Sequence, residues 1–142
     1  MTKHRDDDID FQIQFYEGIL KQKEDFVQAL IAVGDLYTKK GFYERGLAVD
    51  QKLSRLRPDD PTILYNLACS YSLLNQIDEA LAAIQRAIDA GYSNLEFLQN
   101  DSDLANLFND ERFQRYFADL KRKSKQKAQQ KEQRPPSFTD GL

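Results

Sequence analysis

The chain has 142 residues, of which 41% are hydrophobic and 30% are charged, and its formal net charge is −3. These values are ordinary for a single soluble globular domain. A single cysteine excludes an internal disulfide, and no apolar run approaches the ~20 residues that a membrane-spanning helix needs. The opening letters MTKHRDDDID lack the apolar segment of a secretory signal. We therefore expect a cytoplasmic protein without membrane contact.

The net charge conceals an asymmetry along the chain. Residues 1–120 contain 13 basic and 21 acidic residues, which gives a net charge of −8. Residues 121–142 contain 7 basic and 2 acidic residues, which gives +5. This distribution indicates an acidic body followed by a basic tail.

The chain begins with polar residues that predict a flexible acidic N-terminus over residues 1–8. From Ile9 onward, apolar residues recur every three or four positions, as at Ile9, Ile13 and Tyr16. This spacing predicts a helix over residues 9–25 with one apolar face. The letters FQIQF alternate as in a short strand, but the wider helical spacing favours a helix.

Three aspartates, Asp6, Asp8 and Asp10, surround the predicted start of this helix. Negative charge is favourable at a helix N-terminus, so we expect these aspartates to cap it. They also match ligand positions of an EF-hand calcium loop, but Phe11 stands where that loop requires glycine. His4 is the one histidine and cannot form a zinc site or a catalytic triad by itself. We expect no metal and no cofactor.

Residues 26–60 and 61–94 each predict two helices joined by a short turn. Gly41 and Asn75 fall in the two turns, where both residue types tolerate the left-handed conformation. Matching residues recur 34 positions apart, in the pairs Leu30/Leu64, Val33/Leu67, Gly34/Ala68, Tyr37/Tyr71, Tyr43/Ile77, Gly46/Ala80 and Leu53/Ala87. A helix–turn–helix repeat of this period is typical of stacked repeat proteins. By the same offset, residues 9–25 match the second half of a repeat.

These segments resemble the tetratricopeptide repeat (TPR) family. In the first repeat, the apolar and small pair of that family is Val33 and Gly34, its tyrosine is Tyr37, its turn glycine is Gly41 and its closing proline is Pro58. The resemblance implies an all-α fold, a short right-handed TPR solenoid of antiparallel helix pairs. An N-terminal half-repeat helix and an irregular C-terminal helical cap would close the two ends of this TPR domain, which we place over residues 9–120.

The repeats depart from the family pattern at several positions. Asp50 stands where the family has an aromatic residue, and we expect this aspartate to face solvent. Gly46 replaces an alanine, and we expect Gly34 and Gly46 to allow close approach where helices cross. Tyr92 replaces the closing proline of the second repeat, so the second helix ends through Gly91 instead.

The predicted cap over residues 95–120 consists of short helices, with Asp101 and Asn109 as candidate N-caps and a final helix that starts near Asp110. It resembles the divergent unit that closes many bacterial TPR arrays. The basic tail over residues 121–142 has no apolar face, so it is either a solvated helical extension or disordered.

TPR arrays bind a peptide or helix in a concave groove lined by the first helices of successive repeats. Carried over by position, the groove residues are Gln28, Ile31, Asp35, Lys39, Thr62, Tyr65, Asn66, Cys69 and Leu73. Glu96 and Gln99 follow if the third unit continues the stack.

The family's carboxylate clamp for acidic C-terminal peptides matches this sequence at Asn66 alone. An acidic peptide would meet Asp35 and Glu96 without a basic partner. We therefore expect a protein or peptide ligand that is neutral or basic.

The expected function is protein–protein interaction, as an adaptor or scaffold. The alternative is a nucleic-acid-associated protein that contacts phosphates through residues 121–134, although this stretch has no aromatic residue for base stacking. Self-association also stays open. Cys69 has no histidine beyond His4 to activate it, and the sequence has no phosphate-binding glycine loop, so we expect no enzyme.

Overall fold

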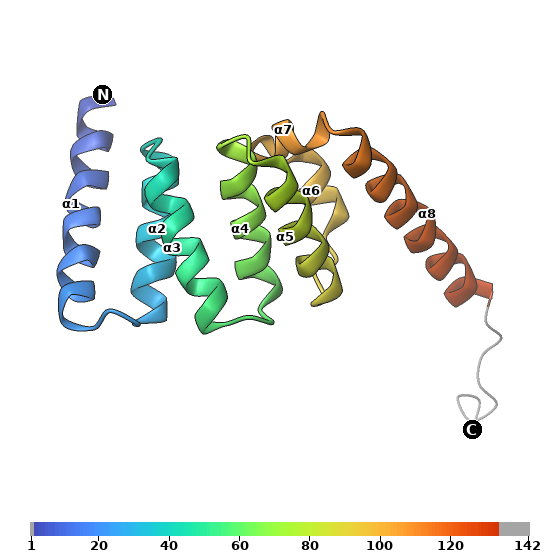
Figure 1. The fold of residues 1–142 in the computed structure, drawn as a ribbon, viewed down its shortest axis with the longest axis horizontal. Helices are drawn as coiled ribbons and strands as arrows, with labels where there is room; N and C mark the ends of the chain where they lie inside the picture. The colour runs from blue at the N-terminus through green and yellow to red at the C-terminus, as the bar shows by residue number, and fades with distance from the viewer. Residues whose placement is uncertain (1, 134–142) are drawn as a thin grey trace, which may run out of the picture. The chain divides into compact units, whose positions relative to one another are not determined.

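A computed structural model describes residues 2–133 of the chain, and every regular element in that range is helical (Figure 1). The all-α class predicted from the sequence is therefore confirmed for these residues. The elements are α1 Thr2–Gln22, α2 Val27–Lys39, α3 Tyr43–Leu56, α4 Pro61–Leu73, α5 Ile77–Asp89, α6 Leu95–Asn100, the 3-10 helix η1 Ser102–Leu104, α7 Ala105–Phe108 and α8 Glu111–Gln133. The chain divides into two compact units, Met1–Leu107 and Phe108–Leu142, which we call the N-terminal and C-terminal units.

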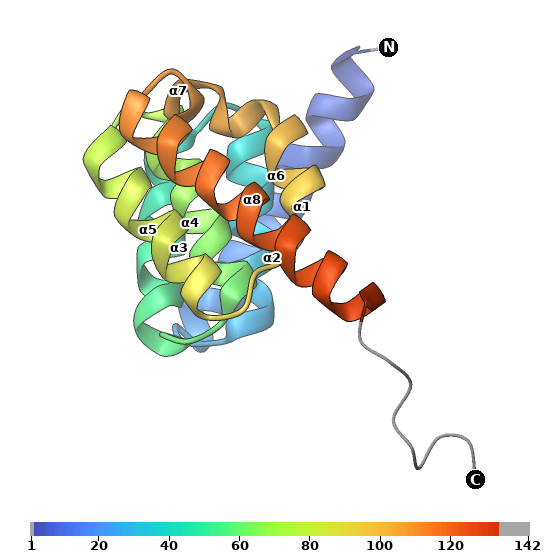
Figure 2. The same cartoon turned by 90° about the vertical axis from the view of Figure 1, so that its right-hand side faces the viewer.

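In the N-terminal unit, consecutive helices pack in adjacent pairs from α1 to α5, and α4 also packs against η1 (Figures 1 and 2). The interior between α1 and α2 contains Ile13, Val33 and Tyr37. The next cluster, formed by Leu30, Leu53 and Ile63, joins α2, α3 and α4. The core therefore continues from α1 to α4, because α2 contributes to both clusters.

Small residues lie where α2 and α3 cross, as the sequence predicted. A Cβ atom at Gly34 would come within 3.1 Å of Val49 Cγ1. A Cβ atom at Gly46 would come within 3.0 Å of Thr38 Oγ1. Both distances are too short for an ordinary van der Waals contact, so the two helices approach this closely because these positions are glycine.

The two turns predicted at Gly41 and Asn75 have the same geometry. Gly41 has φ +82° and Asn75 has φ 58°, so both residues adopt the left-handed conformation. The following amides close the turns, from Phe42 N to the Tyr37 carbonyl at 2.8 Å and from Gln76 N to the Tyr71 carbonyl at 2.9 Å.

A side-chain contact also recurs at a spacing of 34 residues. The hydroxyl of Tyr37 donates to Glu17 Oε1 at 2.7 Å, and this bond joins α2 to α1. Gln51 Nε2 donates to the hydroxyl of Tyr71 at 3.1 Å, and this bond joins α3 to α4. The relation of α1 to α2 is therefore repeated by α3 and α4.

The N-terminal helix is longer than predicted. α1 begins at Thr2, so the predicted start near Ile9 is wrong. Asp6, Asp8 and Asp10 lie inside a continuous helix and do not cap it, and a continuous helix cannot form the EF-hand loop. Asp10 instead forms an ion pair with Lys40 at 3.0 Å, while Gln12 Nε2 donates to Asp8 Oδ2 at 3.2 Å. These two polar contacts support the helical turns that precede Ile9, and a pattern of apolar residues does not reveal them.

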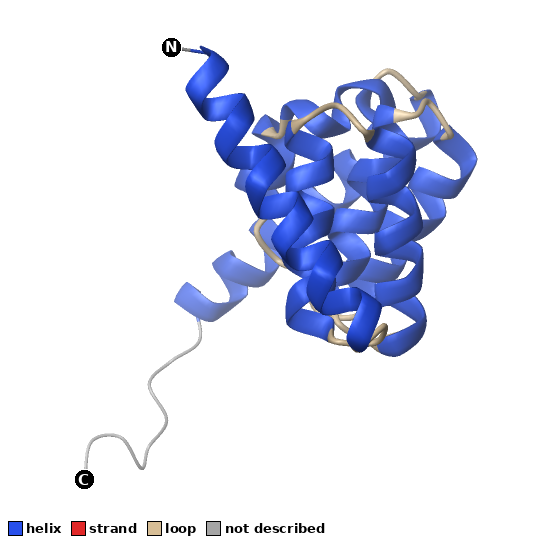
Figure 3. Cartoon of the chain, turned by 90° about the vertical axis from the view of Figure 1, so that its left-hand side faces the viewer, coloured by secondary structure: helices blue, strands red, loops and turns tan. Residues whose placement is uncertain are grey.

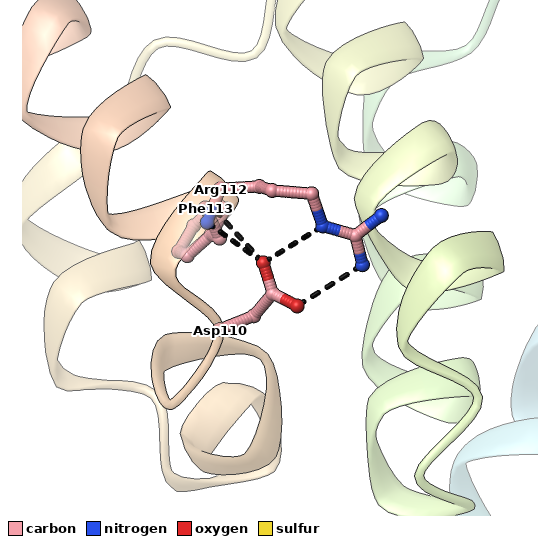
Figure 4. A network of polar contacts seen from close by, with 3 residues as sticks. All are labelled: Asp110, Arg112 and Phe113. Carbon is pink, nitrogen blue, oxygen red and sulfur yellow. Dashed lines mark hydrogen bonds and ion pairs between the residues drawn. The ribbon is translucent and has the colours of Figure 1, made fainter.

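In the C-terminal unit, Asp110 caps α8 (Figure 4). Its Oδ1 accepts bonds from the backbone amides of Arg112 at 2.8 Å and Phe113 at 3.3 Å. The Arg112 guanidinium also donates to this carboxylate, at 3.1 Å from Nε and 3.0 Å from Nη2, and thereby lowers the pKa of Asp110. The predicted helix start near Asp110 is confirmed, but Asn109 is not the cap.

An aromatic cluster joins Phe108 to the first turns of α8. The ring centroid of Phe108 lies 4.8 Å from that of Phe113 and 5.3 Å from that of Phe117. α8 then continues through the basic sequence as far as Gln133, so the structure describes residues 121–133 as helix, the first of the two alternatives. Residues 134–142 of the predicted tail lie outside the described residues.

Candidate functional site

A cleft of about 460 Å³ opens in the N-terminal unit between α2, α4 and the segment from α6 to η1. Six of the nine predicted groove residues line it: Ile31, Asp35, Tyr65, Asn66, Cys69 and Leu73. Gln28, Lys39 and Thr62 are exposed but do not line the cleft. The third wall also differs from the expectation, since Phe97, Asp101 and Asp103 line it in place of Glu96 and Gln99.

Tyr65 connects α4 to this third wall. Its hydroxyl donates to Asp101 Oδ2 at 2.6 Å, and its ring stacks on Tyr92 with the centroids 4.4 Å apart. The side chain is 4% exposed, so Tyr65 serves mainly as an anchor and offers little surface to a ligand. Burial and the bond to Asp101 raise the pKa of Tyr65.

Cys69 lies beside the same carboxylate. Its Sγ is 3.8 Å from Asp101 Oδ2, and the residue is 8% exposed. Burial, followed by the charges of Asp101 and Asp103, raises the pKa of the thiol well above its ordinary value. The thiol is therefore protonated at neutral pH, which is the opposite of an activated nucleophile.

Asp50 is buried, and the prediction that it faces solvent is wrong. The residue is 8% exposed, and Ser70 Oγ donates to its Oδ2 at 2.5 Å. Desolvation raises the pKa of Asp50 to about 6, although the bond from Ser70 acts in the opposite direction. Gly34 lies beside this carboxylate, since a Cβ atom there would be in ordinary van der Waals contact with Asp50 Oδ1, at 3.5 Å.

The cleft is acidic. Its walls include Asp35, Asp50, Asp101 and Asp103, and none of the described residues that line it is Lys, Arg or His. Burial is the main cause that raises the pKa of Asp103, and the charges of Asp101 and Asp35 add to it. Lys39 forms an ion pair with Asp35 at 3.0 Å, but both side chains are exposed, so this pair is weak. Cationic or neutral ligands are therefore favoured over anions.

A second depression of about 370 Å³ surrounds the turn between α2 and α3. Its walls include one cation, Arg45, and one anion, Glu44. The Arg45 guanidinium lies 5.3 Å from the centroid of the Phe42 ring and 5.9 Å from that of Tyr37. Because this side chain already covers two aromatic rings and its charge is balanced, we regard the acidic cleft as the stronger candidate.

No cluster of three or more His, Cys, Asp or Glu side chains within residues 2–133 has the geometry to hold a metal ion. No helix in the same range is both long enough and apolar enough to cross a membrane.

No protein-family model matches the sequence. The chain is similar to a chloroplastic protein of Arabidopsis thaliana, with 33% identity over 103 residues. The match spans 69% of this chain but 30% of the plant protein, so the similarity concerns one part of that longer protein.

Proposed function

We propose that this chain is a TPR-type interaction module that binds a neutral or basic segment of another protein in the acidic cleft. The observation that carries the proposal is the set of four aspartates that line the cleft, where no Lys, Arg or His is among the described lining residues and the one neighbouring cation, Lys39, forms only an exposed ion pair with Asp35. Proteins arrange complementary charge to steer and select their ligands.

The contacts that recur along the N-terminal unit support the TPR-type repeat. The turns at Gly41 and Asn75, and the hydroxyl contacts of Tyr37 and Tyr71, recur at the same 34-residue spacing as the sequence pattern. This period is the one that the TPR family uses. The right-handed solenoid and the half repeat at α1 are parts of the same proposal.

The cleft suits a lysine or arginine side chain from the ligand. The cationic end would lie near Asp35 and Asp103, while its aliphatic stem packs against Ile31 and Leu73. Asn66 is exposed at the cleft, and its side-chain amide can both donate to and accept from a peptide backbone. A segment of mixed basic and apolar character therefore fits best.

The proposal is tested with short fluorescent peptides of equal length, rich in lysine and leucine, in serine and leucine, or in glutamate and leucine. Anisotropy titrations with the full chain should rank the affinity for these peptides as basic, neutral, then acidic. The Asp35→Asn/Asp103→Asn variant should bind the basic peptide about tenfold more weakly, which corresponds to 1.4 kcal/mol.

The matched control removes two exposed charges from α5, outside the cleft, as Glu79→Gln/Asp89→Asn. This control should bind the basic peptide as the wild type does. Equal affinity for all three peptides, or equal loss in both double variants, would contradict the proposed cleft ligand.

A second candidate function rests on the exposed basic residues of α8. These residues are Arg122, Lys123, Lys125, Lys127 and Lys131. Contact with phosphates would weaken steeply as salt concentration rises. A duplex DNA titration at several salt concentrations distinguishes the two functions, because the Lys125→Gln/Lys127→Gln/Lys131→Gln variant would lose DNA binding but keep the basic peptide.

The location of the protein stays a prediction. The sequence favours the cytoplasm, whereas the name of the plant relative places that protein in the chloroplast. The bacterial character of the terminal unit also stays a prediction.

A further inference from the structure

The acidic cleft carries exposed apolar side chains on two of its walls. Ile31 of α2 is 44% exposed and Phe97 of α6 is 56% exposed, and both residues line the cleft. Figure 1 shows α4 between α2 and α6, so the two side chains come from different walls. Both walls are built on helices, which Figure 3 draws in blue. Large apolar groups that stay exposed around a concave site are typical of a binding surface.

The ring of Phe97 is accessible to a ligand. Its centroid lies 6.1 Å from that of Tyr65 with an angle of 53° between the ring planes, so these two rings do not stack. Tyr65 stacks on Tyr92 instead, with the planes 10° apart. Because more than half of the Phe97 side chain is exposed, its ring remains available to a group in the cleft. The face of an aromatic ring attracts cations.

The carboxylates of the cleft differ in how far their oxygens are already bonded. Asp101 accepts the backbone amide of Asp103 through Oδ1 at 3.0 Å and the hydroxyl of Tyr65 through Oδ2 at 2.6 Å. Asp50 is buried and accepts from Ser70. No described residue donates a hydrogen bond to the side chain of Asp103. Asp103 therefore keeps its carboxylate oxygens for a donor that a ligand supplies.

Asp103 also lies among other negative charges. Burial raises the pKa of Asp103, and the charges of Asp101 and Asp35 raise it further. A cation bound between Asp103 and Asp35 would offset this repulsion. Lys39 pairs with Asp35, but both side chains are exposed, so a ligand can displace this contact at little cost.

We propose that the cleft selects an arginine side chain of the bound segment, and that Phe97 is the residue that favours arginine over lysine. The guanidinium stacks on the Phe97 ring and donates to Asp103 and Asp35. Stacking uses the flat face of the guanidinium and hydrogen bonding uses its edge, so one group can make both contacts. The inference rests on the proposed function, because it names the side chain that the acidic cleft binds.

The chemistry of the two basic side chains explains the preference. A guanidinium is planar, carries five N–H donors and is more weakly hydrated than an ammonium group. The ammonium group of lysine is compact and strongly hydrated, and it has no flat face to lay on a ring. The rest of an arginine residue also fits, because its aliphatic stem can pack against Ile31 while Asn66 bonds to the peptide backbone.

Three fluorescent peptides of equal length test the proposal in anisotropy titrations with the full chain. They consist of serine and leucine around one central arginine, lysine or citrulline, and citrulline keeps the planar shape of arginine without its charge. The wild type should bind the arginine peptide about fivefold more tightly than the lysine peptide, and the citrulline peptide most weakly. Phe97→Leu should reduce the preference for arginine over lysine to about twofold or less, since leucine is apolar but has no ring.

Each preference is a ratio measured on one protein, so a change in stability cannot produce it. The matched control Phe11→Leu makes the same substitution at an exposed phenylalanine of α1, outside the cleft, and should keep the wild-type preference. Equal affinity of the wild type for the arginine and lysine peptides would overturn the inference, as would an unchanged preference in Phe97→Leu. The proposed function would survive either result if both basic peptides bind more tightly than the citrulline peptide. Citrulline binding as tight as that of the basic peptides would overturn both.

Discussion

The two helix pairs, α2–α3 and α4–α5, share their turns but differ in their interiors. At equivalent positions, the first pair has Gly34 and Asp50 where the second has Ala68 and Ile84. Ile84 is fully buried and Asp50 is 8% exposed, so a carboxylate occupies a site that the second pair fills with hydrocarbon. The backbone geometry of the repeat therefore tolerates very different chemistry at one position.

The difference shows what a buried carboxylate requires. Ser70 supplies a hydrogen-bond donor to Asp50 from the next helix. Burying a polar group without such a donor costs free energy. The second pair needs no such hydrogen-bond donor, because Ile84 buries apolar surface. In the first pair, Asp50 adds a carboxylate to the cleft wall, and its burial lowers the stability of the fold.

The largest expected effect comes from placing a carboxylate in the second pair. Ile84→Asp should lower the free energy of unfolding by about 3–5 kcal/mol at neutral pH, because a charged group would lose water in a position packed for hydrocarbon. Urea unfolding followed by circular dichroism measures this change. A loss below about 1 kcal/mol would mean that the second pair admits a charge as readily as the first.

Replacing Asp50 by its neutral amide should stabilise the first pair above pH 6. The pKa of Asp50 is raised to about 6 by burial, so the folded state holds its proton while the unfolded chain loses it near pH 4. Wild-type stability should therefore fall between pH 4 and about 6, by an amount on the order of 2–3 kcal/mol. Asp50→Asn keeps an acceptor for Ser70 and should remove this fall.

Unfolding experiments on wild type and Asp50→Asn at several pH values test whether wild-type stability falls as the pH rises. The difference in the free energy of unfolding between the two proteins should grow from pH 4 upward and level off just above pH 6. A constant difference across this range would show that Asp50 ionises in the folded state as it does in solution.

The smallest expected effects concern the shared turns. Gly41→Ala should cost about 1 kcal/mol, because φ +82° is unfavourable for a residue with a Cβ atom. Asn75→Gly should change stability by less, since glycine accepts the same left-handed conformation at the equivalent turn. Thermal melts of the two variants compare the turns directly, and a larger effect at Asn75 would indicate a side-chain role there.

The helices of the two pairs could be predicted closely from the sequence. The apolar spacing, Pro61 and the turn residues Gly41 and Asn75 predicted two helices in each of residues 26–60 and 61–94, and α2 to α5 lie within these ranges on either side of the two turns. These signals are local, since each depends on residues within a few positions of the boundary. The start of α1 was missed because it depends on polar contacts such as the Lys40–Asp10 ion pair, which no periodicity reveals.

The cleft was predicted only in part, because one of its walls does not follow the repeat pattern. Its α2 and α4 walls follow from the repeat pattern, but its third wall depends on α6, which is only six residues long. A helix this short does not continue the register of the repeat, so Phe97 and Asp101 line the cleft where Glu96 and Gln99 were expected. Asp50 was misplaced because its donor, Ser70, lies 20 residues away.

The bond between Cys69 and Asp101 affects how fast the thiol can be alkylated. The thiol is buried, its pKa is raised, and Asp101 reaches it from the segment that follows α6. An alkylating reagent should react slowly with this cysteine in the closed structure and faster when that segment separates from α4. Because the chain has one cysteine, the rate of alkylation reports the frequency of this opening without any engineered label. A ligand held between α4 and the α6–η1 segment would slow that rate, so the natural sequence contains its own reporter of cleft occupancy.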